Sequence, residues 1–288
     1  GSITAETRAA LVELNKMYQD GYLDQELGVR KDADEAWKSG RVGILFSPWW
    51  HGYNVRDGIA NDPAMEWKAY AAPLAADGQW YPKLGGVGSS YCVVRKGYEH
   101  PEAAILLNNY LRVNEGRFQE ETTLDARYYP GRVVITPLDE NSVSVRALRA
   151  VMKGEEAEAF DTVNYKLLES DMSALTECLE APYDDMGIEN WDTGHTVFGR
   201  VYSLLMGSAA VEDAAAAGIV NKIYSVTYTQ TETMEEKWTS LEKKENDIFL
   251  KIIIGEKPID AFDTFVEEWK AEGGDAITAE VQAIVDNK

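Results

Sequence analysis

Tryptophan and tyrosine side chains recur in this sequence where regular elements are expected to end. Trp49, Trp50 and Tyr53 directly follow an apolar run. Trp80 lies in a polar, glycine-rich stretch, and Trp191 stands among Gly, Asn and Asp residues that favour a turn. An indole face stacks on the C–H face of a pyranose while nearby polar groups bind its hydroxyls. These residue types favour a sugar-binding surface, and burial in a core is the alternative for the Trp49–Trp50 pair.

Catalytic and metal-binding patterns are weak by comparison. The chain has no G-x-S-x-G elbow and no P-loop, and the glycines of 85–88 lack the spacing of a dinucleotide fingerprint. Its three histidines stand singly. Cys92 and Cys178 share no metal-ligand spacing, so we expect two buried free thiols. We therefore expect no metal, no cofactor and no enzymatic activity.

A carbohydrate-active hydrolase is the alternative that the carboxylates leave open. Asp184, Asp185 and Glu189 are the candidates for its acid and base. Glycoside hydrolysis needs two carboxyl groups that face each other at a defined separation. Neighbouring residues in a loop do not supply that arrangement, so a solvated or capping role is favoured for them.

The charge balance narrows the classes of partner. Among 288 residues, 49 acidic residues stand against 28 basic ones, for a net charge of -21. A nucleic-acid surface needs clustered Lys and Arg, so none is expected. No apolar stretch reaches the roughly 18 residues of a membrane span. No signal peptide is present, and Gly1-Ser2 has the character of a cloning scar, so we expect the chain to begin inside a longer protein.

Hydrophobic periodicity predicts an α/β protein that becomes helical toward its C-terminus. Three short apolar or alternating runs read as strands: 42–48, 65–73 and 91–97. Helices are expected over 4–20, 31–40, 100–115, 141–155, 166–180, 193–210, 211–224, 232–254, 259–274 and 278–288. Three strands make a thin sheet for so many helices, which is typical of an incomplete α/β domain.

The order of these segments resembles a known family. "DADEAWKSGRVGILFSPWW" is similar to a helix and strand that end in a Pro-Trp turn. "TMEEKWTSLEKKENDIFLKIIIGEKPIDAFDTFVEEWKAEGGDAITAEVQAIV" is its most specific segment. Together they resemble the family 1 extracellular solute-binding proteins of carbohydrate ABC importers, in their lipoprotein-type branch. The resemblance covers nearly the whole chain and matches the second half of those longer proteins.

This resemblance implies a class II periplasmic-binding-protein fold of the maltose-binding-protein type. That fold has two α/β lobes, of which the N-terminal lobe would be largely missing here. Residues 1–84 would belong to the C-terminal lobe, and 85–130 would be a crossing strand and helix of the N-terminal lobe. Residues 131–288 would form the mainly helical remainder of the C-terminal lobe.

The resemblance also implies a function. Such a protein binds an oligosaccharide in the cleft between its lobes and delivers it to ABC permease subunits. It would lie on the extracellular face of a bacterial membrane or in the periplasm, attached only by a lipid anchor on the missing N-terminus. A non-sugar solute is the alternative ligand.

Site residues follow from the matching segments. Trp49 or Trp50 would be the stacking platform and Trp191 the opposite wall. Positions matched less sharply are Tyr53, Trp80, Arg127, Thr233 and Trp238. A uronate ligand would require a cationic side chain, for which Arg127 and Arg200 are the candidates. We expect Trp50→Ala or Trp191→Ala to abolish sugar binding at little cost in stability.

Overall fold

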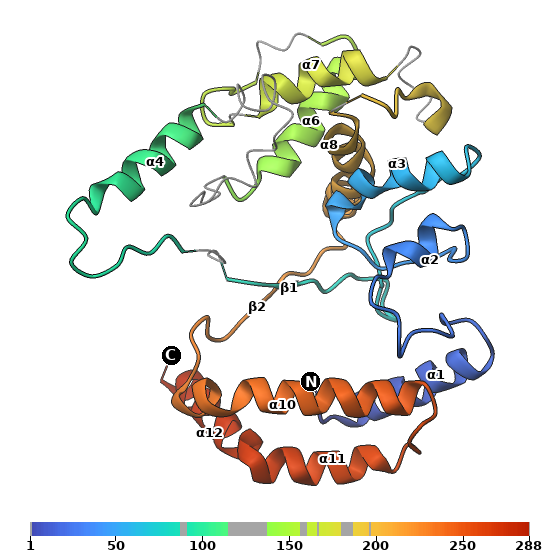
Figure 1. The fold of residues 1–288 in the computed structure, drawn as a ribbon, viewed down its shortest axis with the longest axis vertical. Helices are drawn as coiled ribbons and strands as arrows, with labels where there is room; N and C mark the ends of the chain where they lie inside the picture. The colour runs from blue at the N-terminus through green and yellow to red at the C-terminus, as the bar shows by residue number, and fades with distance from the viewer. Residues whose placement is uncertain are drawn as a thin grey trace. The chain divides into compact units, whose positions relative to one another are not determined.

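The chain forms two compact units. The computed structural model describes residues 2–86, 91–114, 137–155, 160–165, 167–179, 187–195 and 197–287 (Figure 1). Unit 1 comprises residues 1–36, 83–86 and 223–288, and unit 2 comprises 37–82 and 87–222. This division differs from the predicted boundaries, which lie after residue 84 and after residue 130. The second predicted boundary lies outside the described residues.

Helices dominate both units, as the periodicity predicts. Those of unit 1 are α1 (Ala5–Gln19), α10 (Glu232–Ile253), α11 (Ala261–Trp269), the π-helical turn η6 (Lys270–Gly274) and α12 (Asp275–Asp286). Helix α2 (Asp34–Lys38) spans the boundary. Those of unit 2 are the 3₁₀ turn η1 (Trp49–His51), α3 (Gly52–Asn61), α4 (Glu102–Val113), α6 (Glu140–Met152), α7 (Leu168–Cys178), the 3₁₀ turn η4 (Ile188–Asn190), α8 (Phe198–Ser203), the π-helical turn η5 (Leu204–Ser208) and α9 (Ala209–Ala216).

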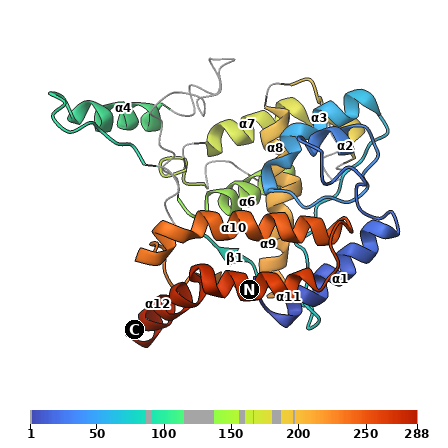
Figure 2. The same ribbon diagram turned by 60° about the horizontal axis from the view of Figure 1, so that its bottom comes forward.

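Unit 1 is a helical assembly around one apolar cluster. Helices α1, α10 and α11 run beside one another in both ribbon views (Figures 1 and 2). Leu11 of α1 packs with Leu241 of α10 and Phe265 of α11 in the core. Burying such side chains stabilises a fold by about 1.5–3 kcal/mol each. Amphipathic periodicity is therefore the cause of this packing.

Polar contacts fix the ends of the unit 1 helices. The side chain of Thr4 accepts a hydrogen bond from the backbone N–H of Thr7 at 3.2 Å, which caps the start of α1. Asn15 donates from Nδ2 to the carbonyl oxygens of Ile252 and Ile253, at 2.9 and 3.1 Å. These carbonyls belong to the last turn of α10, where the regular donor four residues further along the helix is missing. The contact therefore joins α1 to the end of α10.

The core of unit 2 surrounds α8. Leu148 of α6, Leu175 of α7 and Val201 of α8 are fully buried in it, together with Phe198. Helix α8 also packs against α3. The predicted helix over 193–210 is thus present from Phe198, with a π-helical turn inside it.

One predicted helix is too long. The pattern favours a helix over 211–224, whereas α9 ends at Ala216. Gly218 follows with a φ of 71°, a left-handed conformation that glycine adopts without steric cost. Residues 223–224 then form a strand. The apolar residues after the glycine therefore belong to a strand and not to the helix.

The three predicted strands are wrong for this structure. Within the described residues, no strand pairs with 42–48, 65–73 or 91–97. Ile44 and Phe46 of the first run are 83% and 79% exposed. Apolar alternation makes a strand only where a neighbouring chain accepts its hydrogen bonds and covers one face. Neither condition is met at Ile44 and Phe46, and no neighbouring chain pairs with the other two runs.

The strands that form are short and parallel. β1 (Lys83–Leu84) pairs with β2 (Ile223–Tyr224), with Lys83 opposite Ile223. In unit 2, Trp80 bridges Val220 in the same parallel sense. The chain passes between the units at 36/37, 82/83, 86/87 and 222/223, and of these 82/83 and 222/223 are matched positions in these pairings.

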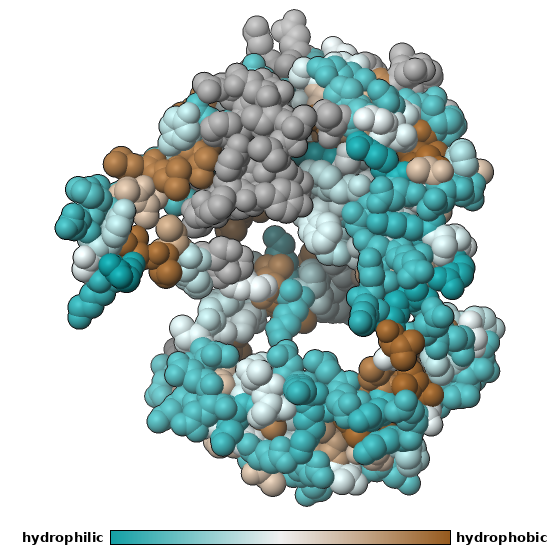
Figure 3. All heavy atoms as spheres, in the orientation of Figure 1, coloured by the Kyte–Doolittle hydropathy of each residue, from teal (hydrophilic) through white to brown (hydrophobic). Residues whose placement is uncertain are grey.

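Helix α4 and the segment before it contain no buried residue. Tyr91 and Val93 of the extended segment are exposed, and so are Leu106 and Tyr110, one turn apart on α4. Figure 3 shows hydrophobic residues over the surface of α4. Cys92 is exposed too, which corrects the expectation of two buried thiols; both cysteines are free, and only Cys178 is buried.

Candidate functional site

The double tryptophan lies in a tight turn that opens a helix. Pro48 has extended backbone angles and precedes the 3₁₀ turn Trp49–His51, which continues into α3 at Gly52. Proline fixes its own φ and cannot donate a backbone hydrogen bond, so it ends the extended run and starts the turn. We call residues 49–53 the aromatic turn.

The two tryptophans of the aromatic turn face different environments. Trp49 is half-buried against the core of unit 2. Trp50 is 46% exposed. An exposed indole of this size is available for stacking on a ligand, whereas the ring of Trp49 contributes to packing. Of the two residues between which the sequence left the choice open, Trp50 is therefore the exposed ring and Trp49 the packed one.

Tyr53, at the start of α3, is half-buried and packs against α8. A Cβ at Gly199 would lie 2.6 Å from Cδ1 of Tyr53, so the helix backbone approaches the ring closely. Below it, Arg200 donates from Nε and Nη2 to the two carboxylate oxygens of Asp171, at 2.5 and 2.8 Å. Burial disfavours the charge of Arg200, but the negative charge of Asp171 outweighs it and raises the pKa of Arg200. Arg200 is thus a charged anchor of α8 to α7.

A second aromatic group supports the turn from within unit 2. The ring of His51 lies edge-on to Trp37, with centroids 4.7 Å apart. Trp37 is fully buried and also meets Trp67 edge-on at 5.9 Å. Edge-to-face pairs of this kind add about 0.5–1.5 kcal/mol beyond their buried area. The aromatic turn is therefore packed on one side by these rings and on the other by α8.

The structure corrects the role predicted for Trp191. It is 5% exposed, and its ring meets Phe198 and Tyr202 edge-on, with centroids 5.9 and 5.5 Å apart. An antiparallel bridge to Leu179 holds its backbone. A side chain enclosed in this way is a core residue and cannot form the wall of a ligand cleft in this arrangement. The local turn signal was right, because η4 precedes Trp191 directly.

Trp80 is half-buried, but its described contacts do not join it to Trp50. Its backbone donates to the carbonyl of Ile219 at 2.8 Å and accepts from the N–H of Asn221 at 2.7 Å. Trp80 is therefore part of the parallel pairing near 82/83.

The remaining predicted positions lie elsewhere. Thr233 donates from Oγ1 to Oε1 of Glu280 at 2.6 Å, and hydrogen bonds from the side chains of Thr231 and Thr233 lower the pKa of Glu280. Trp238 is half-buried against the core of unit 1. Both contact residues of unit 1, whereas the aromatic turn belongs to unit 2. Arg127 lies outside the described residues.

Arg200, one of the two cations proposed to bind a uronate ligand, is already paired within the protein. Both donor groups of Arg200 that face Asp171 are engaged, and the Arg200 side chain is 11% exposed. A guanidinium held bidentately by a buried carboxylate is not available to a ligand carboxylate. The sequence held no signal for this pair, because Asp171 occurs in a helical pattern like the many exposed acids.

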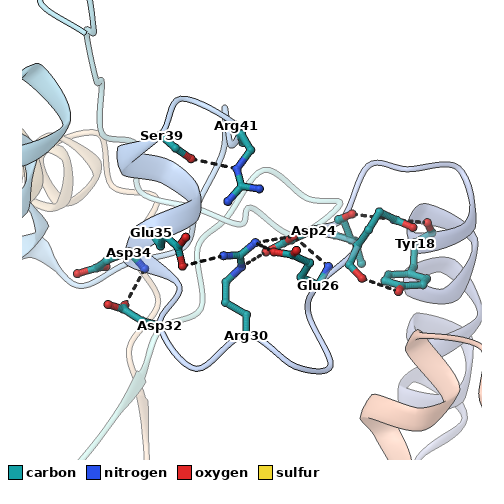
Figure 4. Close-up of polar contacts among 11 residues, drawn as sticks. Tyr18, Asp24, Glu26, Arg30, Asp32, Asp34, Glu35, Ser39 and Arg41 are labelled. Atoms are coloured by element: carbon teal, nitrogen blue, oxygen red, sulfur yellow. Dashed lines mark hydrogen bonds and ion pairs between the residues drawn. The ribbon is translucent and has the colours of Figure 1, made fainter. Parts of the chain in front are cut away.

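The most acidic loop of unit 1 is organised by an arginine. Arg30 lies among the carboxylates of Asp24, Glu26 and Glu35, as Figure 4 shows. Hydrogen bonding to Asp24 raises the pKa of Arg30. Across the described ranges, no group of three or more His, Cys, Asp or Glu residues is arranged to hold a metal. The cluster therefore serves to hold the loop that follows α1.

Of the carboxylates proposed for hydrolysis, the structure describes Glu189 alone. Asp184 and Asp185 lie outside the described residues, and Glu189 is exposed on η4. Cys178 is no better as a nucleophile, since burial and neighbouring carboxylates raise its pKa to about 12.

Comparison with known proteins adds little. No family model matches the chain, and no solved structure matches it. A protein of Niallia circulans, described as "Uncharacterized protein in butB 5'region", is 22% identical over 282 residues. That match covers 93% of this chain and 94% of the relative. Among the helices that the structure describes, none is long and apolar enough to cross a bilayer.

Proposed function

We propose that this chain is the substrate-binding part of a carbohydrate ABC importer, which binds an oligosaccharide and delivers it to a membrane permease. The observation that carries the proposal is the exposed indole of Trp50 on a turn packed between α8 and buried aromatic rings. A sugar ring stacks on such a face while polar groups take its hydroxyls. The protein acts by binding and not by catalysis.

An aromatic turn that is ordered before a ligand arrives favours binding. Each flexible side chain that a ligand immobilises costs about 0.5–1.5 kcal/mol. His51 and Trp49 hold the turn through buried or half-buried rings, so the backbone under Trp50 is ordered before a ligand arrives. This rigidity supports a recognition role for Trp50 over that of an incidental surface tryptophan.

The architecture supports the finer fold that we propose, the class II periplasmic-binding-protein fold. At two of the four points where the chain passes between the compact units, 82/83 and 222/223, neighbouring segments pair in parallel. Adjacent crossing segments suit proteins whose lobes close by hinge motion on a ligand. The family resemblance implies crossing strands of this kind between its lobes, and it assigns residues 1–84 and 131–288 to one lobe.

The uncovered surface of 91–113 supports a lobe completed by further polypeptide. Val93 is 86% exposed in the extended segment, and Val113 of α4 is 70% exposed. Contiguous apolar surface of this kind marks an interaction site. We propose that this segment belongs to the other lobe, in a protein that is lipid-anchored on the extracellular face of the cell membrane or lies in the periplasm.

Thermal unfolding against a panel of neutral and uronate oligosaccharides tests the proposal. A ligand at a hundredfold its dissociation constant adds about 2.7 kcal/mol of stability, which shifts the midpoint visibly. We expect one class of glycan to produce that shift, and Trp50→Ala to remove it. Tyr22→Ala is the matched control, because Tyr22 is an exposed aromatic residue of unit 1.

The outcomes separate the alternatives. A shift that survives Trp50→Ala would place the sugar elsewhere, and release of shortened glycans during the assay would favour the hydrolase. The absence of a shift with every glycan would count against a sugar ligand and favour a different solute.

A further inference from the structure

The aromatic turn lies against a row of small residues on one continuous helical stretch. Gly199, Ser203 and Gly207 recur every four residues through α8 and η5. Each meets the turn or the start of α3. A Cβ at Gly207 would lie 2.2 Å from the carbonyl oxygen of Trp49, and one at Gly52 would lie 2.9 Å from the backbone nitrogen of Ser203.

The π-helical turn η5 keeps this row in line. Four residues of an α-helix rotate by about 400°, so a row spaced by four drifts about 40° at each step. A π-helical turn holds more residues and offsets that drift across Leu204–Ser208. Such turns are rare and occur frequently at functional sites.

We propose that Gly207 is a positioning residue that determines which of the two tryptophans is presented to the ligand. Its missing side chain lets the backbone of Trp49 approach η5, so that the Trp49 ring reaches the core and Trp50 faces outward. This inference rests on the proposed function of Trp50, although the positioning itself can be measured without a sugar.

Contact with backbone makes Gly207 different from Gly199. A side chain at Gly199 would meet the ring of Tyr53 first, at 2.6 Å from Cδ1, and its nearest backbone contact, Cα of Tyr53, would be 3.0 Å away. A side chain at Gly207 would press on the carbonyl oxygen, the carbonyl carbon and Cα of Trp49. No rotamer change relieves that overlap. The aromatic turn has to move away from η5 and withdraw the Trp49 ring from the core.

Fluorine NMR of the chain labelled with 5-fluorotryptophan measures this directly. The eight tryptophans give separate reporters. Trp49→Phe and Trp50→Phe assign the two resonances, and the shift between H₂O and D₂O reports the solvent exposure of each ring. Gly207→Ala is the test variant. Gly43→Ala is the control, because nothing lies within 4 Å of a Cβ there and Gly43 belongs to the same unit.

We expect Gly207→Ala to raise the solvent isotope shift of Trp49 and to move the resonance of Trp50. The resonances of Trp191 in the core of unit 2 and of Trp269 in unit 1 should stay in place. With a glycan found by thermal unfolding, affinity should fall by about tenfold or more. Gly43→Ala should change none of these quantities.

Unchanged Trp49 and Trp50 resonances in folded Gly207→Ala would overturn the proposal. If that variant does not fold, as judged by the Trp191 resonance, Gly199→Ala replaces it. Gly199→Ala should shift the Trp49 and Trp50 resonances by less than Gly207→Ala would. If neither resonance shifts, the proposal is equally overturned. Movement of both rings without binding of any glycan would retain the positioning role and contradict the proposed function.

Discussion

Arg200 and Asp171 face each other in the interior of unit 2, joined by two hydrogen bonds of 2.5 and 2.8 Å. Ser144 of α6 also reaches the carboxylate, donating from Oγ to Oδ2 at 3.4 Å. The pair therefore connects α6, α7 and α8, and α8 in turn supports the aromatic turn. The Arg200–Asp171 pair must therefore stay intact for α8 to hold Trp50 in its observed position.

Asp171→Ala should destabilise the protein severely. It leaves the guanidinium of Arg200 buried without a counter-charge, which typically costs about 3–5 kcal/mol. Urea unfolding of the variant measures this cost. Asp213→Ala is the matched control, because Asp213 pairs with Arg149 at a largely exposed site where an ion pair is worth about 0–1 kcal/mol. Equal losses in both variants would contradict the anchoring role of Asp171.

Trp191→Ala and Trp50→Ala should separate stability from binding. Removing a large core aromatic side chain typically costs about 3–5 kcal/mol, which we expect for Trp191. Trp50→Ala should cost less than about 1 kcal/mol because its ring already faces solvent. Urea unfolding of the two variants in parallel gives the comparison. A loss for Trp50→Ala as large as that for Trp191→Ala would show that Trp50 is a packing residue.

Alkaline pH should destabilise unit 2 through Tyr202. Burial raises the pKa of Tyr202 to about 12 from its ordinary 10.0. Below pH 10, Tyr202 is neutral in both the folded and the unfolded chain, and the free energy of unfolding is at its full value. Between pH 10 and 12 the unfolded chain ionises first, so the free energy of unfolding falls as the pH rises. The loss should reach about 2–3 kcal/mol. Urea unfolding between pH 8 and 12 measures it.

Tyr202→Phe provides the check on that pH dependence. The variant should lose less stability than the parent above pH 10, whereas Tyr22→Phe, at an exposed tyrosine, should follow the parent. Cys178 contributes in the same direction, since its pKa is also raised to about 12. A Tyr202→Phe curve that matches the parent would exclude Tyr202 as the cause.

Substitutions on α4 should be nearly silent in this chain. Leu106→Ser removes an apolar side chain that is 63% exposed, so we expect a change within about 0.5 kcal/mol. Leu148→Ala, at a fully buried position of α6, should cost about 2–5 kcal/mol. Urea unfolding compares them. A large loss for Leu106→Ser would mean that α4 is covered in solution.

Local sequence signals predicted the helices well. Thr4 before α1 and Gly21 and Gly40 after helical runs mark ends by capping and turn chemistry, which depend on nearby residues alone. The turn after Pro48 follows from the fixed φ of proline for the same reason. Gly218 carried an equally local stop signal, which the apolar residues beyond it obscured.

Strand pairing and aromatic burial depend on residues far along the chain. Residues 42–48 have the composition of a strand, but pairing requires a neighbouring edge that the pattern cannot supply. Trp191 has the neighbours of a loop residue, yet Phe198 and Tyr202 enclose it. Likewise, Trp49 and Trp50 look equivalent in sequence, but Trp49 packs against the core of unit 2 whereas Trp50 is 46% exposed.

Titration of the chain with the stabilising oligosaccharide by calorimetry, beside Trp50→Ala and Tyr22→Ala, tests the central claim most directly. We expect saturable heat for the parent and for Tyr22→Ala, and none for Trp50→Ala at the same concentrations. Equal affinity of Trp50→Ala and the parent would contradict the claim that Trp50 is the sugar platform.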